Sequence, residues 1–336
     1  MARQSGPIDA LIVAVPETAG SALYGMVDVL GAAGNLWEQL AGGEARQLLR
    51  PRIVSPKRRP FLCGNRIPVR PELSIADCGT PDIIILPELW LGPDEPISGR
   101  HQAIVDWVRR CYRGGAFVYS ACSGAILLAE TGLLDGREAT SHWGYERQFR
   151  TRYPKVRFNP KPALQFADPA GRIVTAGGTT SWHDLALHII ARHCGPGEAA
   201  RIAKVYLLKT HEEGQLPYAA LVRDAPHADA AVREAEALLK MNFRATDALG
   251  QTVSRSRLPE RTLKRRFKAA TGLALIDYVQ NLRIEEAKRL LETTALPVEA
   301  ISAEVGYDNL SFFNRLFRRR CGLTPARYRK LFNPDR

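Results

Sequence analysis

Cysteine is scarce in this chain, and the few cysteines show no pairing pattern. No two of them have the short spacing of a zinc-ligand pair, and none has histidine-rich neighbours. The pattern excludes a zinc site and a disulfide framework, so we expect no metal, no cofactor and a reduced, cytoplasmic setting. The six positions are Cys63, Cys78, Cys111, Cys122, Cys194 and Cys321.

The chain also lacks long apolar runs. No stretch approaches the roughly 18 apolar residues that a membrane helix needs. The opening sequence MARQSGPIDALIVAV contains an apolar run of about six residues, and no cleavage pattern follows it. We therefore expect neither a signal peptide nor a membrane span.

Negative charge is in deficit, above all in the C-terminal third. The formal net charge is +12, and from Asp229 onward 21 Lys and Arg face 13 Asp and Glu, which places +8 in the last 108 residues. A basic region favours a polyanionic partner, because phosphate neutralisation supplies most non-specific affinity for nucleic acid. An ordinary solvated face is the alternative. At 336 residues the chain exceeds one typical domain, so we expect two.

The N-terminal part alternates strand and helix patterns. Short, continuous apolar runs at Ala10–Val15, Ile83–Leu86 and Ala116–Ser120 are typical of buried parallel strands. Helical patterns lie between them. Strands that alternate with helices predict a parallel α/β sheet with helices on both faces. The region 39–59 is ambiguous, with strand signal only at Arg52–Val54.

The segment from Tyr119 to Trp143 contains a candidate reactive site. A strand ends at Ser120, and small residues surround Cys122 before an apolar helix begins. This pattern indicates a nucleophile elbow, which would place the thiol near a helix N-terminus where the dipole favours thiolate. His142 follows twenty residues later, so the pair could be a nucleophile and its base. The alternative is that Cys122 is a small buried hydrophobe and His142 a polar pocket residue.

These motifs resemble a known family. The elbow Ala121-Cys122-Ser123-Gly124-Ala125, the run LLAETGLLDGREAT and Ser141-His142-Trp143 are similar to the ThiJ/PfpI-type, amidotransferase-like domain over residues 8–208. The resemblance implies a flavodoxin-like parallel sheet sandwich of the nucleophile-elbow type. It also implies that the Cys and His of these motifs form the reactive pair.

One acid of the family pattern is missing. Enzymes of that superfamily carry Glu or Asp six residues before the position of Asp28. Ala22 stands there in this chain, and Glu17 lies too early to substitute for the acid. We therefore expect no enzyme activity in this domain and a pocket that binds a small molecule without turning it over.

The segment before the helix at 182–193 allows two interpretations. Gly177, Gly178 and Thr179–Ser181 offer backbone amides and hydroxyls that suit a small polar or anionic ligand, which would make them a second pocket wall. We favour the other interpretation, a plain turn with Ser181 as the helix N-cap. The chain from 209 to 228 then mixes Gly, Pro and polar residues without periodicity, and we expect a linker there.

Residues 297–320 predict two short helices joined by a tight turn. Gly306 can end the first helix in the left-handed conformation, and Asp308 or Asn309 can cap the second. Phe313 and Phe317 point inward at i, i+4 spacing. The opposite face is polar and basic, which fits the DNA major groove. It offers Ser311, Asn314, Arg315 and Arg318.

This helix-turn-helix unit has a twin. A shift of fifty residues superposes TLKRRFKAATGLALIDY, from Thr262, on FFNRLFRRRCGLTPARY, from Phe312. The register places Arg265 on Arg315. The repeat predicts a first helix-turn-helix at about 246–270. Its second helix is expected to expose Arg261, Lys264, Arg265 and Lys268.

Two such units joined by one long helix, here Ile276–Leu291, resemble the AraC/XylS-type DNA-binding domain over residues 229–333. Its motifs are RIEEAKRLL from Arg283, Val305-Gly306-Tyr307 and the segment GLTP from Gly322. The resemblance implies an all-α domain whose two recognition helices enter successive major grooves of double-stranded DNA. The first unit departs from the family at its turn, where it carries Arg255 and Arg257 in place of the usual small residues.

The resemblance implies a role for each residue from its position in the family pattern. The second helix of each helix-turn-helix unit would face one of two successive major grooves, and Asn309 would lie near the start of the helix in the second unit. A phosphate contact, which positions without specifying, is the alternative for each basic residue, and we favour it for Lys264 and Arg318. The candidates are Arg261, Lys264 and Arg265 in one groove and Ser311, Asn314, Arg315 and Arg318 in the other.

The two domains together resemble the GlxA-like transcriptional regulators. The resemblance implies a sequence-specific regulator that binds operator or promoter DNA, forms a homodimer, senses a small-molecule effector and contacts RNA polymerase. A Cys122-dependent enzyme of hydrolase, hydratase or amidase type that also binds DNA is one alternative. A first domain that only dimerises the protein is another.

Overall fold

The computed structural model describes residues 6–92, 94–222 and 227–334. The chain forms two compact units, Met1–Gln215 and Leu216–Arg336. Each unit encloses hydrophobic clusters of its own. Among the described residues, no helix is both long and apolar enough to cross a membrane.

A seven-stranded sheet forms the centre of the first unit, in the order β10-β11-β7-β6-β1-β2-β5. All neighbouring strands are parallel except β10, which runs antiparallel to β11. The central strand β6 is fully buried, because helices cover both of its faces. The strands are β1 Ile8–Val13, β2 Leu49–Ser55, β5 Leu73–Ser74, β6 Ile83–Leu86, β7 Phe117–Ala121, β10 Leu164–Phe166 and β11 Ile173–Ala176.

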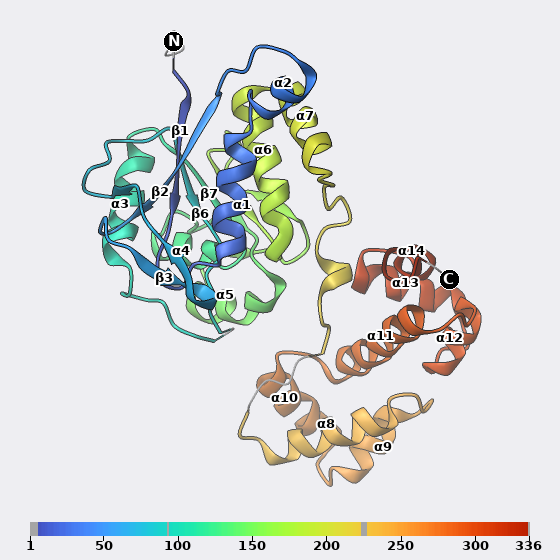
Figure 1. Ribbon diagram of the computed structural model, residues 1–336. Helices are drawn as coiled ribbons and strands as arrows, with labels where there is room; N and C mark the ends of the chain where they lie inside the picture. The colour runs from blue at the N-terminus through green and yellow to red at the C-terminus, as the bar shows by residue number, and fades with distance from the viewer. Residues whose placement is uncertain (1–5, 93, 223–226, 335–336) are drawn as a thin grey trace. The chain divides into compact units, whose positions relative to one another are not determined.

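Helices cover both faces of this sheet (Figure 1). On one face, α1 (Gly20–Gly31) and α6 (Trp182–Cys194) share a cluster with Ala10 and Ile12 of β1. On the other face, α3 (Gln102–Arg113) and α4 (Gly124–Glu130) share a cluster with the alternate β1 residues, since successive strand side chains point to opposite faces. The predicted parallel α/β fold is confirmed, and the ambiguous region 39–59 contains β2.

Smaller elements complete the first unit. The short strands β3 and β4 form an antiparallel pair, and β8 pairs with β9 in parallel. The bounds are α2 Leu36–Ala41, β3 Phe61–Cys63, η1 Gly64–Arg66, β4 Ile67–Val69, β8 Glu138–Ala139, η2 Trp143–Tyr145, α5 Glu146–Arg152, β9 Arg157–Phe158, η3 Thr179–Ser181 and α7 Pro196–Tyr206.

The described part of the second unit is helical, as predicted. The long helix α11 has its N-terminal half in a core with α8 and α10, and its C-terminal half in a core with α12, α13 and α14. It therefore joins two small helical groups (Figure 1). The helices are α8 Ala230–Asn242, α9 Ala248–Arg255, α10 Glu260–Thr271, α11 Leu275–Thr293, α12 Val298–Glu304, α13 Leu310–Cys321 and α14 Pro325–Phe332.

The pairs α9–α10 and α12–α13 form two helix-turn-helix units, and the fifty-residue repeat is visible in their geometry. Gly272 and Gly322 end α10 and α13 with φ values of 76° and 77°. The turns differ: in the second unit Gly306 has φ 88°, whereas in the first unit Arg257 adopts φ 54°. The left-handed conformation therefore falls on a glycine in one turn and on an arginine in the other.

The segment expected to be a linker, 209–228, is largely packed where it is described. Residues 209–215 belong to the first unit, and Gln215 is buried there. Residues 216–222, with the 3-10 turn η4 (Leu216–Tyr218), belong to the second unit, where Ala219 is buried. Residues 223–226 of this range lie outside the described residues.

Candidate functional site

The predicted elbow is present at Cys122. The strand β7 ends at Ala121, Cys122 adopts a left-handed φ of 52°, and α4 begins at Gly124. A non-glycine residue in this conformation is strained, and a strained strand-to-helix turn is the mark of a nucleophile elbow. A Cβ on Gly124 would lie 2.2 Å from the carbonyl oxygen of Leu86. Glycine at 124 thus lets the end of β6 pass directly against the elbow.

This close approach brings a carboxyl group to the thiol. Sγ of Cys122 donates to Oε1 of Glu88 at 3.6 Å, and Oγ1 of Thr179 donates to the same oxygen at 3.3 Å. Glu88 is only 8% exposed, and its other oxygen, Oε2, has no hydrogen-bond partner among the described residues. Three elements therefore converge here: the chain after β6, the elbow after β7 and the 3-10 turn η3.

The electrostatics of the pair favour neutral side chains. Burial raises the pKa of the Cys122 thiol far above its usual value, and the neighbouring Glu88 carboxylate raises it further. Burial also raises the pKa of Glu88. Burial and the Glu88 carboxylate therefore act against the thiolate that the helix dipole was expected to favour.

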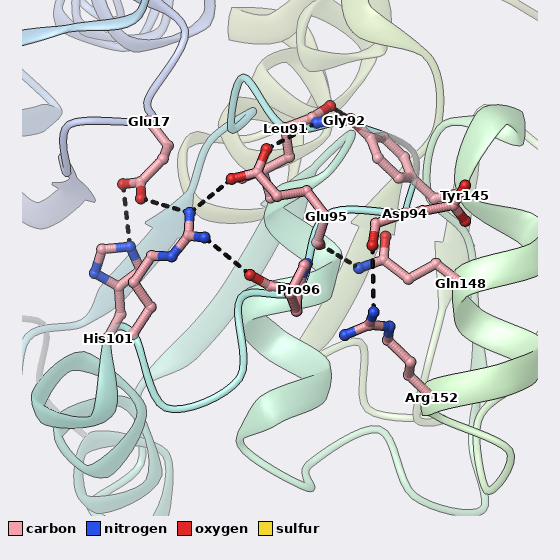
Figure 2. Close-up of polar contacts among 11 residues, drawn as sticks. Glu17, Leu91, Gly92, Asp94, Glu95, Pro96, His101, Tyr145, Gln148 and Arg152 are labelled. Carbon is pink, nitrogen blue, oxygen red and sulfur yellow. Dashed lines mark hydrogen bonds and ion pairs between the residues drawn. The ribbon is translucent and has the colours of Figure 1, made fainter.

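The loop that contains Glu88 is hydrogen-bonded to the elbow. Oγ of Ser123 accepts from the amide of Leu89 at 2.8 Å and donates to the carbonyl oxygen of Leu89 at 2.5 Å. Figure 2 shows the continuation of this loop, where the Tyr145 hydroxyl donates to the carbonyl oxygen of Leu91 at 2.8 Å. These bonds fix the backbone on both sides of the site.

The position of the expected acid lies on α1, but the loop after β6 brings another acid to the thiol. Ala22 is fully buried and supplies no carboxyl group, as its sequence position requires. Glu17 is committed elsewhere: it pairs with Arg100 at 3.1 Å and with His101 at 3.1 Å (Figure 2), and the His101 contact lowers its pKa to about 2. The prediction of a thiol without an adjacent acid is nevertheless wrong, since Glu88 supplies that acid.

The segment after β8 forms another side of the site. Oγ of Ser141 donates to the carbonyl oxygen of Cys122 at 2.7 Å. Nδ1 of His142 accepts from the amide of Gly144 at 2.9 Å and so caps the 3-10 turn η2. This nitrogen is therefore engaged in a structural contact. The pairing of His142 as a base for Cys122 stays a prediction.

The buried side chain of Gln215 closes this side. Its Nε2 donates to Oγ1 of Thr140 and to the carbonyl oxygen of Ser141, both at 2.9 Å. Its Oε1 accepts from the amide of Trp143 at 3.2 Å. The last residue of the first unit thus holds the backbone next to the elbow. At η3, Ser181 occupies the N-cap position of α6, as the plain-turn interpretation predicts, and its side chain makes no cap hydrogen bond.

The second unit presents the predicted polar face on α13. Phe313 and Phe317 are fully buried, while Ser311, Arg315 and Arg318 are exposed and Asn314 is half-buried. Asn309 is exposed, and its side-chain oxygen accepts from the amide of Phe312 at 2.9 Å. Asn309 therefore caps the helix. Its Oδ1, which a base contact would need, is engaged by this hydrogen bond.

The corresponding face of α10 is more strongly charged. Arg261, Lys264 and Arg265 are exposed, and Lys264 forms an ion pair with Glu260 one turn earlier. Arg266 turns away and holds Asp229, the N-cap of α8, at 2.6 Å. Within residues 227–334, no carboxylate pairs with Arg261, Arg265, Arg315 or Arg318. These guanidinium groups are available to a polyanion.

Comparison with known proteins assigns both units. A model of the DJ-1/PfpI family matches residues 35–192, and a model of the helix-turn-helix domain matches residues 253–331. The HTH-type transcriptional regulator CdhR of Pseudomonas aeruginosa is 28% identical over 291 residues, which cover 84% of this chain and 82% of the relative. The chain is a DNA-binding transcription regulator with a DJ-1/PfpI-like first unit.

A second relative agrees with this assignment, and a solved structure shares part of the fold. The HTH-type transcriptional regulator GlxA of Rhizobium meliloti is 28% identical over 229 residues, which cover 66% of the regulator described here and 68% of the relative. A crystal structure of a Vibrio parahaemolyticus protein, described as a transcriptional regulator, covers 60% of the regulator and 100% of its own chain. Its TM-score of 0.51 at 17% identity shows a likeness of fold.

Sequence reasoning missed two residues of the regulator's first unit. Glu88 follows β6, and the neighbouring parallel strand β7 leads into Cys122. Because parallel strands end at the same edge of a sheet, an acid directly after one buried strand was a usable signal. Gln215 lay in the expected linker, where composition offered no signal. Among the described residues of the regulator, no group of three or more His, Cys, Asp or Glu side chains could hold a metal ion.

Proposed function

We propose that the first unit binds a small polar effector over Cys122 and that the bound state changes the affinity of the second unit for DNA. One observation carries the proposal: Oε2 of Glu88 is buried beside the thiol and Thr179 and has no hydrogen-bond partner in the described part of the chain. A buried polar atom without a partner costs about 1–3 kcal/mol. A ligand that hydrogen-bonds this oxygen would remove that cost.

Three features support binding without turnover. Burial and Glu88 both raise the pKa of Cys122, so little thiolate is present near neutral pH. Nδ1 of His142 already accepts the Gly144 amide. Both named relatives are transcription regulators. An enzyme that uses Cys122 as nucleophile would instead need turnover that disappears in a Cys122→Ser variant.

The effector proposal is tested by thermal unfolding of the full-length protein against a panel of small polar metabolites. We expect a ligand that raises the unfolding temperature of the wild type and fails to do so in Glu88→Gln, which keeps the size of the side chain but changes its free oxygen to an amide. Asp28→Asn, on α1, serves as a matched control. A ligand that stabilises the wild type and Glu88→Gln equally would place the effector elsewhere.

For the second unit, we infer that α10 and α13 read DNA bases in two successive major grooves, about 34 Å apart along the duplex. Arg265 and Arg315, twins in the repeat and both exposed, are assigned to base edges. Lys264 and Arg318 are assigned to phosphates, and Arg261, Ser311 and Asn314 to supporting contacts in the grooves. The free guanidinium groups on both helices support this assignment.

The remaining partners follow from the same proposal. The regulator acts as a cytoplasmic homodimer joined through its first unit, and it contacts RNA polymerase at the promoter. If the first unit only dimerised the protein, Cys122→Ser and Glu88→Gln would leave regulation of the target genes unchanged. Mapping of bound sites across the genome is the decisive first experiment, because the neighbouring genes point to the pathway of the effector.

A further inference from the structure

The segment Leu216–Val222, which lies between the two domains in the sequence, is built into the DNA-reading unit. The turn η4 contacts the recognition helix α13. The ring of Tyr218 packs against Phe332 at the end of α14, with 5.3 Å between ring centroids. The segment therefore has fixed neighbours on two helices of the second helix-turn-helix group.

A polar stripe on α11 holds the backbone of this segment. Nδ2 of Asn281 donates to the carbonyl oxygen of Leu221 at 3.0 Å, and the Leu221 amide donates to Oε1 of Glu285 at 2.7 Å. Nζ of Lys288 donates to the carbonyl oxygen of Ala219 at 2.8 Å. The three side chains recur at i, i+4 and i+7, so they lie on one face of the helix. Asn281 and Lys288 are almost fully buried, 5% and 6% exposed.

Two consecutive side chains of the segment enter two different cores. Leu221 packs against the cluster formed with α12, α13 and α14, whereas Val222 packs against the cluster formed with α8 and α10. α11 passes through both clusters. The segment thus lies along the joint between the two helix-turn-helix groups, as a second connection beside α11.

The other end of the segment is anchored in the first unit. Gln215 directly precedes Leu216, and its buried side chain holds Thr140 and the Ser141 carbonyl oxygen. Ser141 in turn holds the carbonyl oxygen of Cys122. One short stretch of chain therefore has the elbow at one end and the joint between the two DNA-reading groups at the other.

We propose that Leu216–Val222 is a positioning element of the DNA reader: it sets the two recognition helices relative to each other and links that setting to the elbow at Cys122 through Gln215. The link to the elbow rests on the proposed effector function, whereas the positioning role does not. Two binding modules that are held rigidly gain affinity only for DNA whose half-sites match their spacing. A looser joint loses that selectivity while each module still binds.

The test uses the full-length protein and an operator selected from random DNA. Binding is measured on operators in which base pairs are added or removed, one at a time, between the two half-sites, and on DNA with one half-site. We expect the double variant Leu221→Ala, Val222→Ala to show a preference for the best spacing that is about tenfold smaller than in the wild type. Its binding to a single half-site should be unchanged. Leu221→Met combined with Val222→Ile restores the preference. Met241→Ala, at a 79% exposed site on α8, is the matched control.

Two results would overturn the positioning role: an unchanged spacing preference, or an equal loss on all DNAs including the single half-site. The second result would mark Leu221 and Val222 as ordinary core residues. For the link to the elbow, Gln215→Ala is expected to reduce the preference for the best spacing, as the double alanine variant does. An unchanged dependence of affinity on spacing in Gln215→Ala would overturn this link. A failure of the effector proposal shows separately, in thermal unfolding of Glu88→Gln, which leaves the segment untouched.

Discussion

Oε1 of Glu88 accepts a hydrogen bond from the thiol of Cys122 at 3.6 Å. The two residues are 34 positions apart in sequence, but they follow β6 and β7, which are paired in parallel with Leu86 opposite Ser120. The contact joins a nucleophile elbow to an acid from the loop after β6, whereas the family pattern places the acid at the position of Ala22 on α1. It also raises the pKa of the thiol, in addition to the larger effect of burial.

The first prediction concerns the reactivity of Cys122. Glu88→Gln should shift the pH profile of Cys122 alkylation to lower pH, because the nearby carboxylate raises the pKa of the thiol and the amide carries no charge. The measurement is the rate of iodoacetamide labelling against pH, followed at the peptide level by mass spectrometry so that the other cysteines are separated. Burial is the larger cause, so labelling stays slow in both proteins. Rapid labelling of the wild type at pH 7 would contradict this account.

The second prediction concerns stability against pH. The pKa of Glu88 is higher in the folded state than in the unfolded chain, because burial disfavours the carboxylate. The folded protein therefore binds this proton more tightly than the unfolded chain does. The resulting contribution of Glu88 to the free energy of unfolding is fully present at low pH and is lost as the pH rises through the folded pKa. Glu88→Gln has no such loss. Its unfolding temperature relative to the wild type should therefore rise as the pH increases above about 4, the usual pKa range of a glutamate.

A constant difference between the two proteins over this range would contradict a raised pKa for Glu88. Glu95→Gln provides the control, since that side chain is 41% exposed and a hydrogen bond from Arg100 lowers its pKa. The difference between that variant and the wild type should change in the opposite direction with pH.

The features that the sequence predicted well depend on local order. The elbow was visible because a strand, a cluster of small residues and an apolar helix follow one another within a few residues of Cys122. The two helix-turn-helix units were visible because Phe313 and Phe317, and their twins in the repeat, lie at helical spacing, and helical spacing places such residues on one buried face. Both signals are contained in short windows of the chain.

The features that were missed depend on contacts between distant residues. The Glu88 contact needs the order of the strands in the sheet, which composition does not give. The segment Leu216–Val222 was expected to be a linker because it contains proline and has no periodicity. Its partners Asn281, Glu285 and Lys288 lie 60 to 69 residues further along the chain. Nothing within the segment itself indicates them.

The third prediction concerns the turn of the first helix-turn-helix unit. Arg257 adopts φ 54°, a left-handed conformation that costs a non-glycine residue about 1–2 kcal/mol. Arg257→Gly should raise the free energy of unfolding by about 1 kcal/mol, once the greater freedom of glycine in the unfolded chain is deducted. Urea unfolding of the full-length protein, followed by helical circular dichroism, measures this. Arg255→Gly, at the end of α9, should instead lower stability by about 0.5 kcal/mol. A loss of stability in Arg257→Gly would show that its side chain matters more than its backbone strain.

The fourth prediction separates base contacts from phosphate contacts. Arg265→Ala and Arg315→Ala should each weaken binding to the selected operator by about 1–3 kcal/mol and weaken binding to random DNA much less, because a bidentate arginine contact discriminates between bases. Lys264→Ala and Arg318→Ala should weaken binding to operator and to random DNA to a similar degree. Each should also reduce the slope of log K against log salt concentration by about one unit. Fluorescence anisotropy over a range of salt concentrations measures both quantities. Equal losses on operator and random DNA for Arg265→Ala or Arg315→Ala would reassign that arginine to the phosphate backbone, and the two recognition helices would then differ in role despite their matching positions in the repeat.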